Sequence, residues 1–256
     1  MCLVVLAFNA DAEYPLLVAA NRDEFHARPT LAAGWWSDQP DIMAGRDLEA
    51  GGTWLGANRR GRFATITNFR EAKSRSSKLR SRGHLVTEFL LSDLGSTQYL
   101  RTISGDNYAG FNLLVADGTS LAYLSNRGGS LQELPAGIYG LSNATLDTSW
   151  EKVERSKTQL AVLLENGQVN ETHLLRLLDD RNKGPVAEVR GDRLPFAIAH
   201  AITAPFIVTP EYGTRCSTVV RAHRSGQWQF KERRFNSSGN SVGDSQFSFS
   251  VSADRQ

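Results

Sequence analysis

Two groups of residues near the start of the chain have the types and spacing to do chemistry. Cys2 is the second residue, and residues 21–24 are Asn-Arg-Asp-Glu. The stretches 2–8 and 16–20 are short apolar runs rich in Val and Leu, and the polar segment between them contains turn formers. Two such runs joined by a short polar connection predict a β-hairpin. We therefore expect a thiol and a charged cluster on neighbouring strands.

The register of this hairpin decides which residues face Cys2. A turn centred near residues 11–12 sets Cys2 opposite residues 21–23 in an antiparallel pair. With the initiator methionine removed, which a small second residue permits, Cys2 carries a thiol and a free α-amino group. Because an α-amine has a pKa near ~8, it can serve as a base near neutral pH and activate the thiol of its own residue.

The charged neighbours of Cys2 would support this chemistry. A guanidinium at Arg22 would lower the pKa of the thiol and raise the thiolate fraction. Asp23 or Glu24 would hold the amine or the arginine in place. The alternative interpretation is that Cys2 is a small apolar residue that begins an inner strand, as buried free cysteines often do. The hairpin alone does not decide between these two interpretations.

The composition favours a globular protein without a nucleic-acid or membrane partner. The 256 residues can bury one substantial core, and the net charge of +2 is too small to indicate a nucleic acid or a membrane surface as partner. No apolar run approaches the roughly eighteen residues of a membrane span, and no basic segment precedes the first apolar stretch. The two cysteines form no disulfide framework. We therefore expect a soluble protein in the reducing cytoplasm, with its oligomeric state open.

The order of predicted elements indicates the fold class. Apolar alternation predicts strands over 62–69, 108–117, 120–127, 204–209, 215–222 and 227–235, and another ending in 137–140. Helical spacing of apolar residues predicts helices over 84–94, 96–104, 149–165 and 170–180, the last with Asn170 as its N-cap. Strands, a helix pair, strands, a second helix pair and further strands predict two face-to-face sheets with helices outside, in one layered α+β domain over 1–256.

Several stretches have no clear periodicity. Residues 25–36 and 183–204 are predicted to be irregular, and residues 236–256 form a polar tail in which 247–251 is a candidate edge strand. Residues 71–83 are basic and serine-rich. This segment is either a solvated loop or a flap that meets an anionic group of a substrate. Its cations are Lys73, Arg75, Lys78, Arg80 and Arg82.

Four motifs together resemble one protein family. They are NRDEF at 21–25, RP at 28–29, GGTWLG at 51–56 and TNFR at 67–70. They are similar to the NRDE family, also called the Transport and Golgi organisation protein 2 family. The resemblance implies a four-layer αββα fold of the N-terminal-nucleophile hydrolase type, with two antiparallel sheets between helix layers. It also implies distant kinship with choloylglycine hydrolases and penicillin acylases, which cleave amide bonds with an N-terminal cysteine.

The resemblance assigns catalytic roles to residues of the first hairpin. Cys2 matches the catalytic cysteine of those amidases. Their arginine and aspartate follow the first hairpin in an Arg-x-x-Asp pattern, and Arg22 fits the arginine. The carboxylate is displaced here, because Asp23 directly follows Arg22. Asp23 is therefore the candidate for the aspartate role.

The remaining candidates lie further along the chain. The resemblance matches Asn68 to the oxyanion-hole asparagine, Asn143 to a second catalytic asparagine and Arg215 to the last active-site arginine. The alternative is structural: the two asparagines satisfy turn backbones, and Arg215 forms a surface pair with Glu211. The same motifs supply three candidate substrate-binding residues, namely Glu24, Trp54 and Arg70.

Two classes of function remain open at this point. The first is a cysteine N-terminal-nucleophile amidohydrolase that cleaves the carbon–nitrogen bond of a small or acylated non-peptide amide. The second is a non-enzymatic carrier, since the family resemblance suggests haem trafficking and the basic loop suggests lipid or acyl-CoA handling. Features for haem are Trp35, Trp36, Trp54, His26, His84 and Cys2. The histidines lack metal-ligand spacing, so we expect no metal site and no cofactor, with haem only as a candidate ligand.

Overall fold

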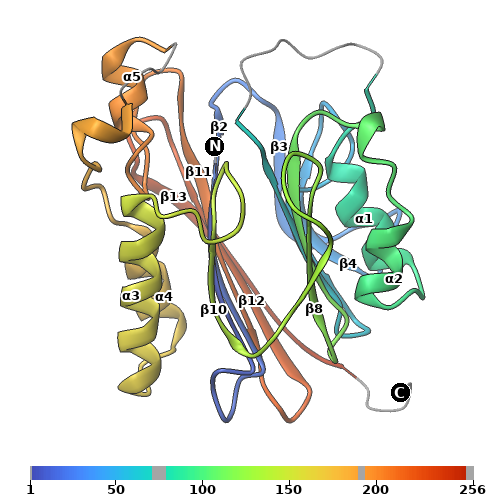
Figure 1. Cartoon of the computed structure of the whole chain (residues 1–256). Coiled ribbons are helices and arrows are strands. Elements are labelled where there is room, and N and C mark those ends of the chain that lie inside the picture. Colours follow the sequence, from blue (N-terminus) through green and yellow to red (C-terminus); the bar gives the residue numbers. More distant parts are fainter. Residues whose placement is uncertain (1, 71–78, 190–193, 252–256) are drawn as a thin grey trace.

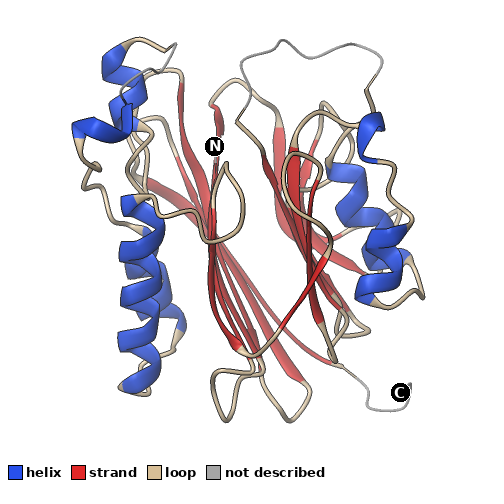
Figure 2. Cartoon of the chain, in the orientation of Figure 1, coloured by secondary structure: helices blue, strands red, loops and turns tan. Residues whose placement is uncertain are grey.

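The computed structural model describes residues 2–70, 79–189 and 194–251, and it has four layers (Figures 1 and 2). Two antiparallel sheets face each other at the centre. Helices α1 (Gly83–Leu91) and α2 (Ser96–Arg101) cover the outer face of one sheet. Helices α3 (Glu151–Glu165) and α4 (Glu171–Leu178) cover the outer face of the other. The predicted αββα arrangement is confirmed.

The six-stranded sheet contains the chain start. Its order is β10 (Gly137–Leu141), β1 (Cys2–Phe8), β2 (Leu16–Phe25), β11 (Tyr212–Ala222), β12 (Gln227–Phe235) and β13 (Ser241–Ser250). The inner strands are apolar on both faces because one face meets the second sheet and the other meets helices. Val4 of β1 and Val18 of β2 belong to the core between the sheets, whereas Leu3 and Leu17 pack under α3 and α4.

The seven-stranded sheet completes the inner layers. Its order is β3 (Thr30–Trp35), β4 (Ile42–Asp47), β5 (Leu55–Asn58), β6 (Phe63–Asn68), β7 (Phe111–Ala116), β8 (Leu121–Ser125) and β9 (Gln132–Leu134). Phe63 and Leu114 face the core between the sheets, and Phe111 and Leu113 pack under α1 and α2. Alternate residues of each strand thus reach opposite layers.

One predicted strand is wrong. Residues 204–209 form no strand, and their only ladder contact among the described residues is an isolated bridge from Val208 to Gly213. Their backbone is bonded elsewhere: the N–H of Phe206 donates to the carbonyl of Asp180, and the carbonyl of Pro205 accepts from Asn21. A short buried apolar run fits a packed loop as well as a strand, so the apolar pattern could not separate the two.

Two segments expected to be irregular contain regular structure. Strand β3 lies within 25–36, and α5 (Phe196–Ala201) with a 3-10 turn (Val186–Val189) lies within 183–204. The candidate edge strand of the polar tail is present as β13 but starts earlier than predicted. Most residues of β13 are polar, because it is an edge strand of the sheet and pairs with β12 on one side. Most of the basic loop, 71–78, lies outside the described residues.

The helices of the described segments are all too short or too polar to cross a membrane. The longest is α3, with 15 residues. The N-cap predicted for α4 is confirmed, since the side chain of Asn170 accepts from the N–H of His173.

Candidate active site

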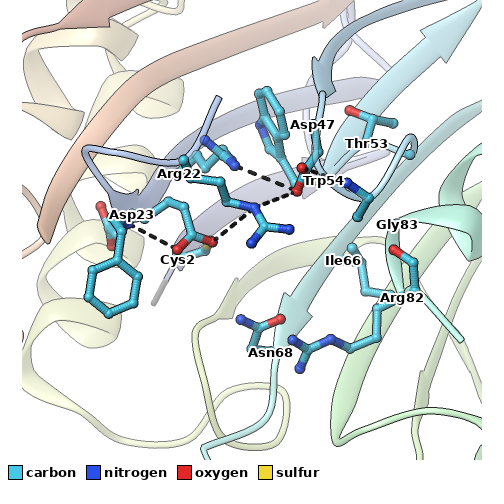
Figure 3. A pocket seen from close by; sticks show the side chains of 16 residues that line it. Cys2, Arg22, Asp23, Asp47, Thr53, Trp54, Ile66, Asn68, Arg82 and Gly83 are labelled. Carbon is cyan, nitrogen blue, oxygen red and sulfur yellow. Dashed lines mark hydrogen bonds and ion pairs between the residues drawn. The ribbon is translucent and has the colours of Figure 1, made fainter. Parts of the chain in front are cut away.

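A pocket of about 290 Å³ lies where the polar end of the first hairpin faces the second sheet. Cys2 and Arg22 of the hairpin line it from the six-stranded sheet (Figure 3). Trp54 and Asn68 line it from the other sheet, and Arg82 lines it from the start of α1. The pocket therefore joins two layers at the point where both sheets present polar residues.

The first hairpin has the register predicted from the sequence. Cys2 pairs directly with Arg22, and Leu3 pairs with Asn21. Directly opposite residues of an antiparallel pair point to the same face of the sheet. Cys2 and Arg22 therefore both face the space between the two sheets.

The nitrogen of Cys2 is held by Asn143, a buried residue just after β10. The N–H of Cys2 donates to Oδ1 of Asn143 at 3.1 Å. The amide nitrogen of Asn143 donates in turn to the carbonyl of Asn68 at 2.7 Å. Ser142 donates to the carbonyl of Cys2 at 2.7 Å, and the carbonyl of Ser142 accepts from Thr67 at 2.6 Å. This turn ties the chain start to the end of β6.

The two asparagines consequently differ in what they offer to a substrate. Asn143 is 2% exposed, its oxygen faces the nitrogen of Cys2 and its amide nitrogen is committed to a backbone carbonyl. Asn68 has an exposed side chain that lines the pocket (Figure 3). Its amide is the one of the two that can reach the oxygen of a bound carbonyl group. The side chain of Asn143 therefore orients the nitrogen of Cys2, and that of Asn68 is the candidate oxyanion donor.

Arg22 is buried on the side of the pocket that faces the second sheet. Its side chain is 5% exposed, and its guanidinium lies 4.2 Å from the centroid of the Trp54 ring. It donates to Thr30 at 3.2 Å and lies 4.0 Å from the carboxylate of Asp47. Arg28 donates to that same carboxylate at 2.8 Å. One carboxylate therefore fixes two guanidinium groups at the wall of the pocket.

Asp23 lines the same pocket, but it follows Arg22 along β2, so its carboxyl group lies on the side of the sheet that the helices cover. It is 3% exposed, and its carboxylate accepts from the hydroxyl of Thr214 at 2.7 Å. Burial raises the pKa of Asp23 to about 6, against the opposing effects of the positive charge at the chain start and of Lys152. The backbone N–H of Asp23 donates to the sulfur of Cys2. The backbone of Asp23 thus contacts the sulfur of Cys2, whereas its carboxyl group contacts Thr214.

The thiol does not have the depressed pKa expected from its neighbour Arg22. Burial raises the pKa of Cys2, and the charge of Asp23 raises it further. The positive charge at the chain start, the N–H of Asp23 and the guanidinium of Arg22 act in the lowering direction without reversing this effect. The cost of removing a thiolate from water outweighs both nearby positive charges here. The thiol therefore needs a base to become a nucleophile, and the nitrogen of Cys2 is the group on the same residue.

The other predicted residues divide between the pocket and its frame. Glu24 and Trp54 line the pocket. Arg215 occupies a β-bulge between Thr214 and Cys216, and its guanidinium donates to the backbone carbonyls of Phe25 and Arg28. Neither Arg215 nor Arg70 is among the described residues that line the pocket. The exposed Arg70 supports it through its backbone N–H, which donates to the carbonyl of Asn143.

Sequence reasoning missed Asp47 and Lys152. Asp47 precedes the GGTWLG motif, but nothing in the sequence indicates that its carboxylate reaches Arg22 and Arg28. Lys152 does have a signal: it lies four residues before Ser156 and eight before Leu160, both buried on α3. A lysine on the buried stripe of a helix is unusual, because lysine is almost never fully buried without a partner.

The described residues contain no group of three or more His, Cys, Asp or Glu side chains that could hold a metal ion. Four histidines form hydrogen bonds with other protein groups. His26 bonds the carbonyl of Thr209, and His200 bonds that of Gly184. The other two, His173 and His223, bond Gln168 and Ser225.

The sequence profile of the Transport and Golgi organisation 2 family matches residues 1–237. The chain belongs to this family. The Transport and Golgi organization protein 2 homolog of Bos taurus is 36% identical to it over 256 residues, covering 91% of this chain and 92% of the relative. The homolog of Homo sapiens is 35% identical with the same coverage. The family membership expected from the four motifs is confirmed.

A solved structure confirms the fold of this family member. The chain is similar to a Caenorhabditis elegans ortholog of N-acylethanolamine-hydrolyzing acid amidase, with a TM-score of 0.52 and 12% sequence identity. The similarity covers 85% of this chain and 92% of that chain. At this identity the comparison concerns the fold, which is that of the N-terminal-nucleophile hydrolases. Function must be argued from the site itself.

Proposed function

We propose that the protein is a cysteine amidohydrolase that cleaves the carbon–nitrogen bond of a small or acylated non-peptide amide. One observation carries the proposal: the nitrogen of Cys2 is oriented by Asn143 at the inner end of a pocket into which Asn68 projects. A nucleophile, its base and an amide donor thus converge on one small space. The named solved neighbour hydrolyses N-acylethanolamines, which are amides of this kind.

The reaction has two covalent steps. The sulfur of Cys2 adds to the amide carbonyl carbon while its proton passes to the α-amino group, and Asn68 donates to the developing oxyanion. The carbon–nitrogen bond then breaks, and the amino group returns the proton to the leaving nitrogen. This leaves a thioester on Cys2 and releases an amine. Water, deprotonated by the same amino group, hydrolyses the thioester to a carboxylic acid and restores the thiol.

This mechanism requires two conditions. The initiator methionine must be removed, because a peptide-bonded nitrogen at Cys2 cannot accept a proton. The sulfur must also remain a free thiol, which favours the reducing cytoplasm as the compartment. Both cysteines are free in the structure.

The size and polarity of the pocket limit the substrate. The pocket volume of about 290 Å³ lies just below the roughly 300–1,000 Å³ that small-molecule sites enclose. Trp54 and Ile66 supply apolar wall, whereas Glu24, Arg28 and Arg82 supply charge. We therefore expect the substrate to place a short polar group near the arginines and an apolar group along Trp54.

The decisive experiment compares the processed wild-type chain with Cys2→Ala and with Cys216→Ala. The probes are acyl-aminomethylcoumarin amides with short and long acyl chains, and iodoacetamide as an electrophile. Intact mass first shows whether Met1 is absent. We expect Cys2→Ala to lose at least about 10³-fold in turnover, as for removal of other catalytic nucleophiles. Cys216→Ala should keep its activity, since Cys216 is buried outside the pocket lining. Equal turnover in wild type and Cys2→Ala would reject the enzyme proposal.

A carrier role is the second candidate, and the family name favours it, since that name refers to transport. The tryptophans that are candidates for haem contact do not share one site. Trp36 packs in the outer core under α1 and α2, and Trp35 packs against the core between the sheets, whereas Trp54 lines the pocket. A haem titration separates the candidates: a Soret shift abolished by Cys2→Ala would support a carrier, and no shift would remove haem as its ligand.

A further inference from the structure

The turn that follows β10, residues 142–146, continues a strand of the six-stranded sheet but is hydrogen-bonded to the other sheet. Three successive backbone carbonyls of this turn, those of residues 142, 143 and 144, accept from β6, from β7 and from the segment just after β6. Their donors, in that order, are the Thr67 hydroxyl at 2.6 Å, the Arg70 N–H at 2.8 Å and the Asn112 amide at 2.8 Å. The seven-stranded sheet therefore fixes the position of a turn that begins in the six-stranded sheet.

We propose that Asn112 is a positioning residue of this site, which holds the turn that carries Asn143 and thereby orients the nitrogen of Cys2. The inference rests on the proposed function and deepens it, because it identifies what keeps the nucleophile and the oxyanion donor at a constant spacing. Asn112 lies on β7, the strand next to β6, and is not among the described residues that line the pocket.

The side chain of Asn112 is fully buried and fully hydrogen-bonded. It shares a face of β7 with Leu114, which belongs to the core between the sheets. Its amide nitrogen donates to the hydroxyl of Thr67 at 3.2 Å and to the carbonyl of Ala144 at 2.8 Å. Its oxygen accepts from the hydroxyl of Tyr123 at 2.8 Å. Both amide hydrogens and the amide oxygen are therefore engaged.

The two ends of this chain of groups fix the direction of its hydrogen bonds. At one end the backbone N–H of Leu146 donates to the hydroxyl of Tyr123 at 3.1 Å, so that this hydroxyl donates onward to Asn112. At the other end the carbonyl of Ser142 can only accept, so Thr67 donates to it and accepts from Asn112. Aspartate and leucine have a similar size to asparagine, but neither could donate to both partners of Asn112.

The turn held in this way supplies the partner of the Cys2 nitrogen. Oδ1 of Asn143 accepts from this nitrogen at 3.1 Å, and the amide nitrogen of Asn143 donates to the carbonyl of Asn68 at 2.7 Å. Thr67 directly precedes Asn68, the candidate oxyanion donor. The bond between Thr67 and Asn112 therefore joins the strand of the oxyanion donor to the turn that orients the base.

Loosening this turn should affect the chemical step more than substrate binding. Misplacement of a reacting group by about 1 Å can cost a factor of about 10² in rate. The residues that line the pocket are unchanged in an Asn112 variant, so KM should change little. A buried polar network also contributes to stability, because a partner left unsatisfied costs free energy. A structural role alone would therefore lower stability without changing the reactivity of Cys2.

The direct test replaces Asn112 itself. Asn112→Leu has a similar size but makes none of the three side-chain hydrogen bonds. The rate of Cys2 alkylation by iodoacetamide at pH 7 is followed by peptide mass spectrometry in the processed chain, together with kcat and KM on the amide probes. We expect alkylation and kcat to fall about 10²-fold, with KM within about threefold of wild type.

Tyr123→Phe is a milder variant, because it removes a single hydroxyl and keeps the ring in the core. We expect alkylation of Cys2 and kcat to be about tenfold slower. The matched control is Tyr99→Phe, whose hydroxyl is also buried and donates to the carbonyl of Leu85 at 2.7 Å, between α2 and α1. Urea unfolding compares the stabilities of the two variants. Tyr99→Phe should keep the wild-type rates despite its own loss of a hydrogen bond.

A second pair of variants applies if Asn112→Leu does not fold. Thr67→Val keeps the shape of the side chain but cannot donate to Ser142, whereas Thr67→Ser keeps the hydroxyl and loses a methyl group. We expect Thr67→Val to slow alkylation of Cys2 about tenfold and Thr67→Ser to stay within about threefold of wild type. Wild-type alkylation in Tyr123→Phe, or equal rates in Thr67→Val and Thr67→Ser, would overturn the proposal. Absence of amide turnover in the wild type, with these differences in alkylation present, would reject the enzyme proposal alone.

Discussion

The two faces of β2 place two adjacent charged residues, Arg22 and Asp23, in different surroundings. Arg22 faces the second sheet, where a pocket, an aromatic ring and the carboxylate of Asp47 surround it. The carboxyl group of Asp23 lies on the helix-facing side, where it is 3% exposed and accepts from Thr214. One strand therefore delivers a cation toward the substrate and an anion into the protein.

The difference teaches how the work of the site is divided. Successive residues of a strand point to opposite faces, so two adjacent residues suffice to serve two layers. The face of β2 that carries Arg22, here called the open face, can contact a substrate. Changes there should affect turnover more than folding. The face that carries Asp23 is here called the closed face. Ionisation of Asp23 there costs stability, because burial disfavours an ionised carboxyl group.

On the open face, Asn68→Ala should slow turnover by a factor of about 10² to 10³, as expected for loss of one oxyanion donor. Folding should change little, because the side chain is exposed. The measurement is kcat and KM on the amide probes together with urea unfolding. Asn166→Ala is the control, since that side chain bonds the carbonyl of Val162 in its own helix. A variant with normal kcat would place the oxyanion donor elsewhere.

On the closed face, Asp23→Asn should raise stability. The folded-state pKa of about 6 lies above the ordinary value of 3.8, so ionising Asp23 penalises the folded state above pH 6. The neutral asparagine resembles the protonated acid, which avoids this cost. At pH 8 we expect a gain of up to about 3 kcal/mol in the free energy of unfolding. The gain should shrink as pH falls through 6 and vanish below about 4. Urea unfolding at several pH values measures it, and equal stability of the two proteins at pH 8 would refute it.

At the wall of the open face, Asp47→Asn should lower the free energy of unfolding by about 2 kcal/mol, because a charged hydrogen bond to Arg28 is lost. The new amide can keep accepting from the N–H groups of Glu49 and Ala50, so the turn survives. Asp38→Asn is the matched control: its pair with Arg46 is exposed, and its loss should be nearly silent. Similar losses in both variants would show that burial of the Asp47 cluster does not matter.

The features predictable from the sequence are those with local patterns. The hairpin register follows from two apolar runs and one turn, which is why Cys2 and Arg22 are correctly opposed. Asn170 and the stripe of α4 follow from helix spacing and capping. These patterns depend on neighbours within a few positions.

The missing features depend on contacts between distant segments. Asp47 meets Arg22 only because two sheets stack face to face, and no periodicity encodes that contact. The sequence indicates Asn143 as a candidate, but its commitment to the Asn68 carbonyl depends on how β6 and β10 approach each other. The raised pKa of Cys2 depends on burial, which outweighs the guanidinium that its sequence neighbourhood brings close. The sequence gives the residue types, but their charge also depends on how deeply the fold buries them, which the sequence does not show.

The smallest expected effect concerns Arg215, for which the family resemblance and the geometry point to different roles. Its guanidinium donates to the carbonyls of Phe25 at 2.8 Å and Arg28 at 3.1 Å, and the β-bulge at its position turns the side chain toward that loop. As a clamp on the loop, it should contribute about 1 kcal/mol to stability, and Arg215→Met should leave turnover within about threefold of wild type. Urea unfolding and turnover of the amide probes check this, with Arg224→Met as a control at a distant turn that bonds Ala12. If turnover instead fell by a factor of about 10² in a folded variant, as for loss of a transition-state contact, Arg215 would have the catalytic role that the resemblance implies. That result would also extend the open face of β2 onto β11.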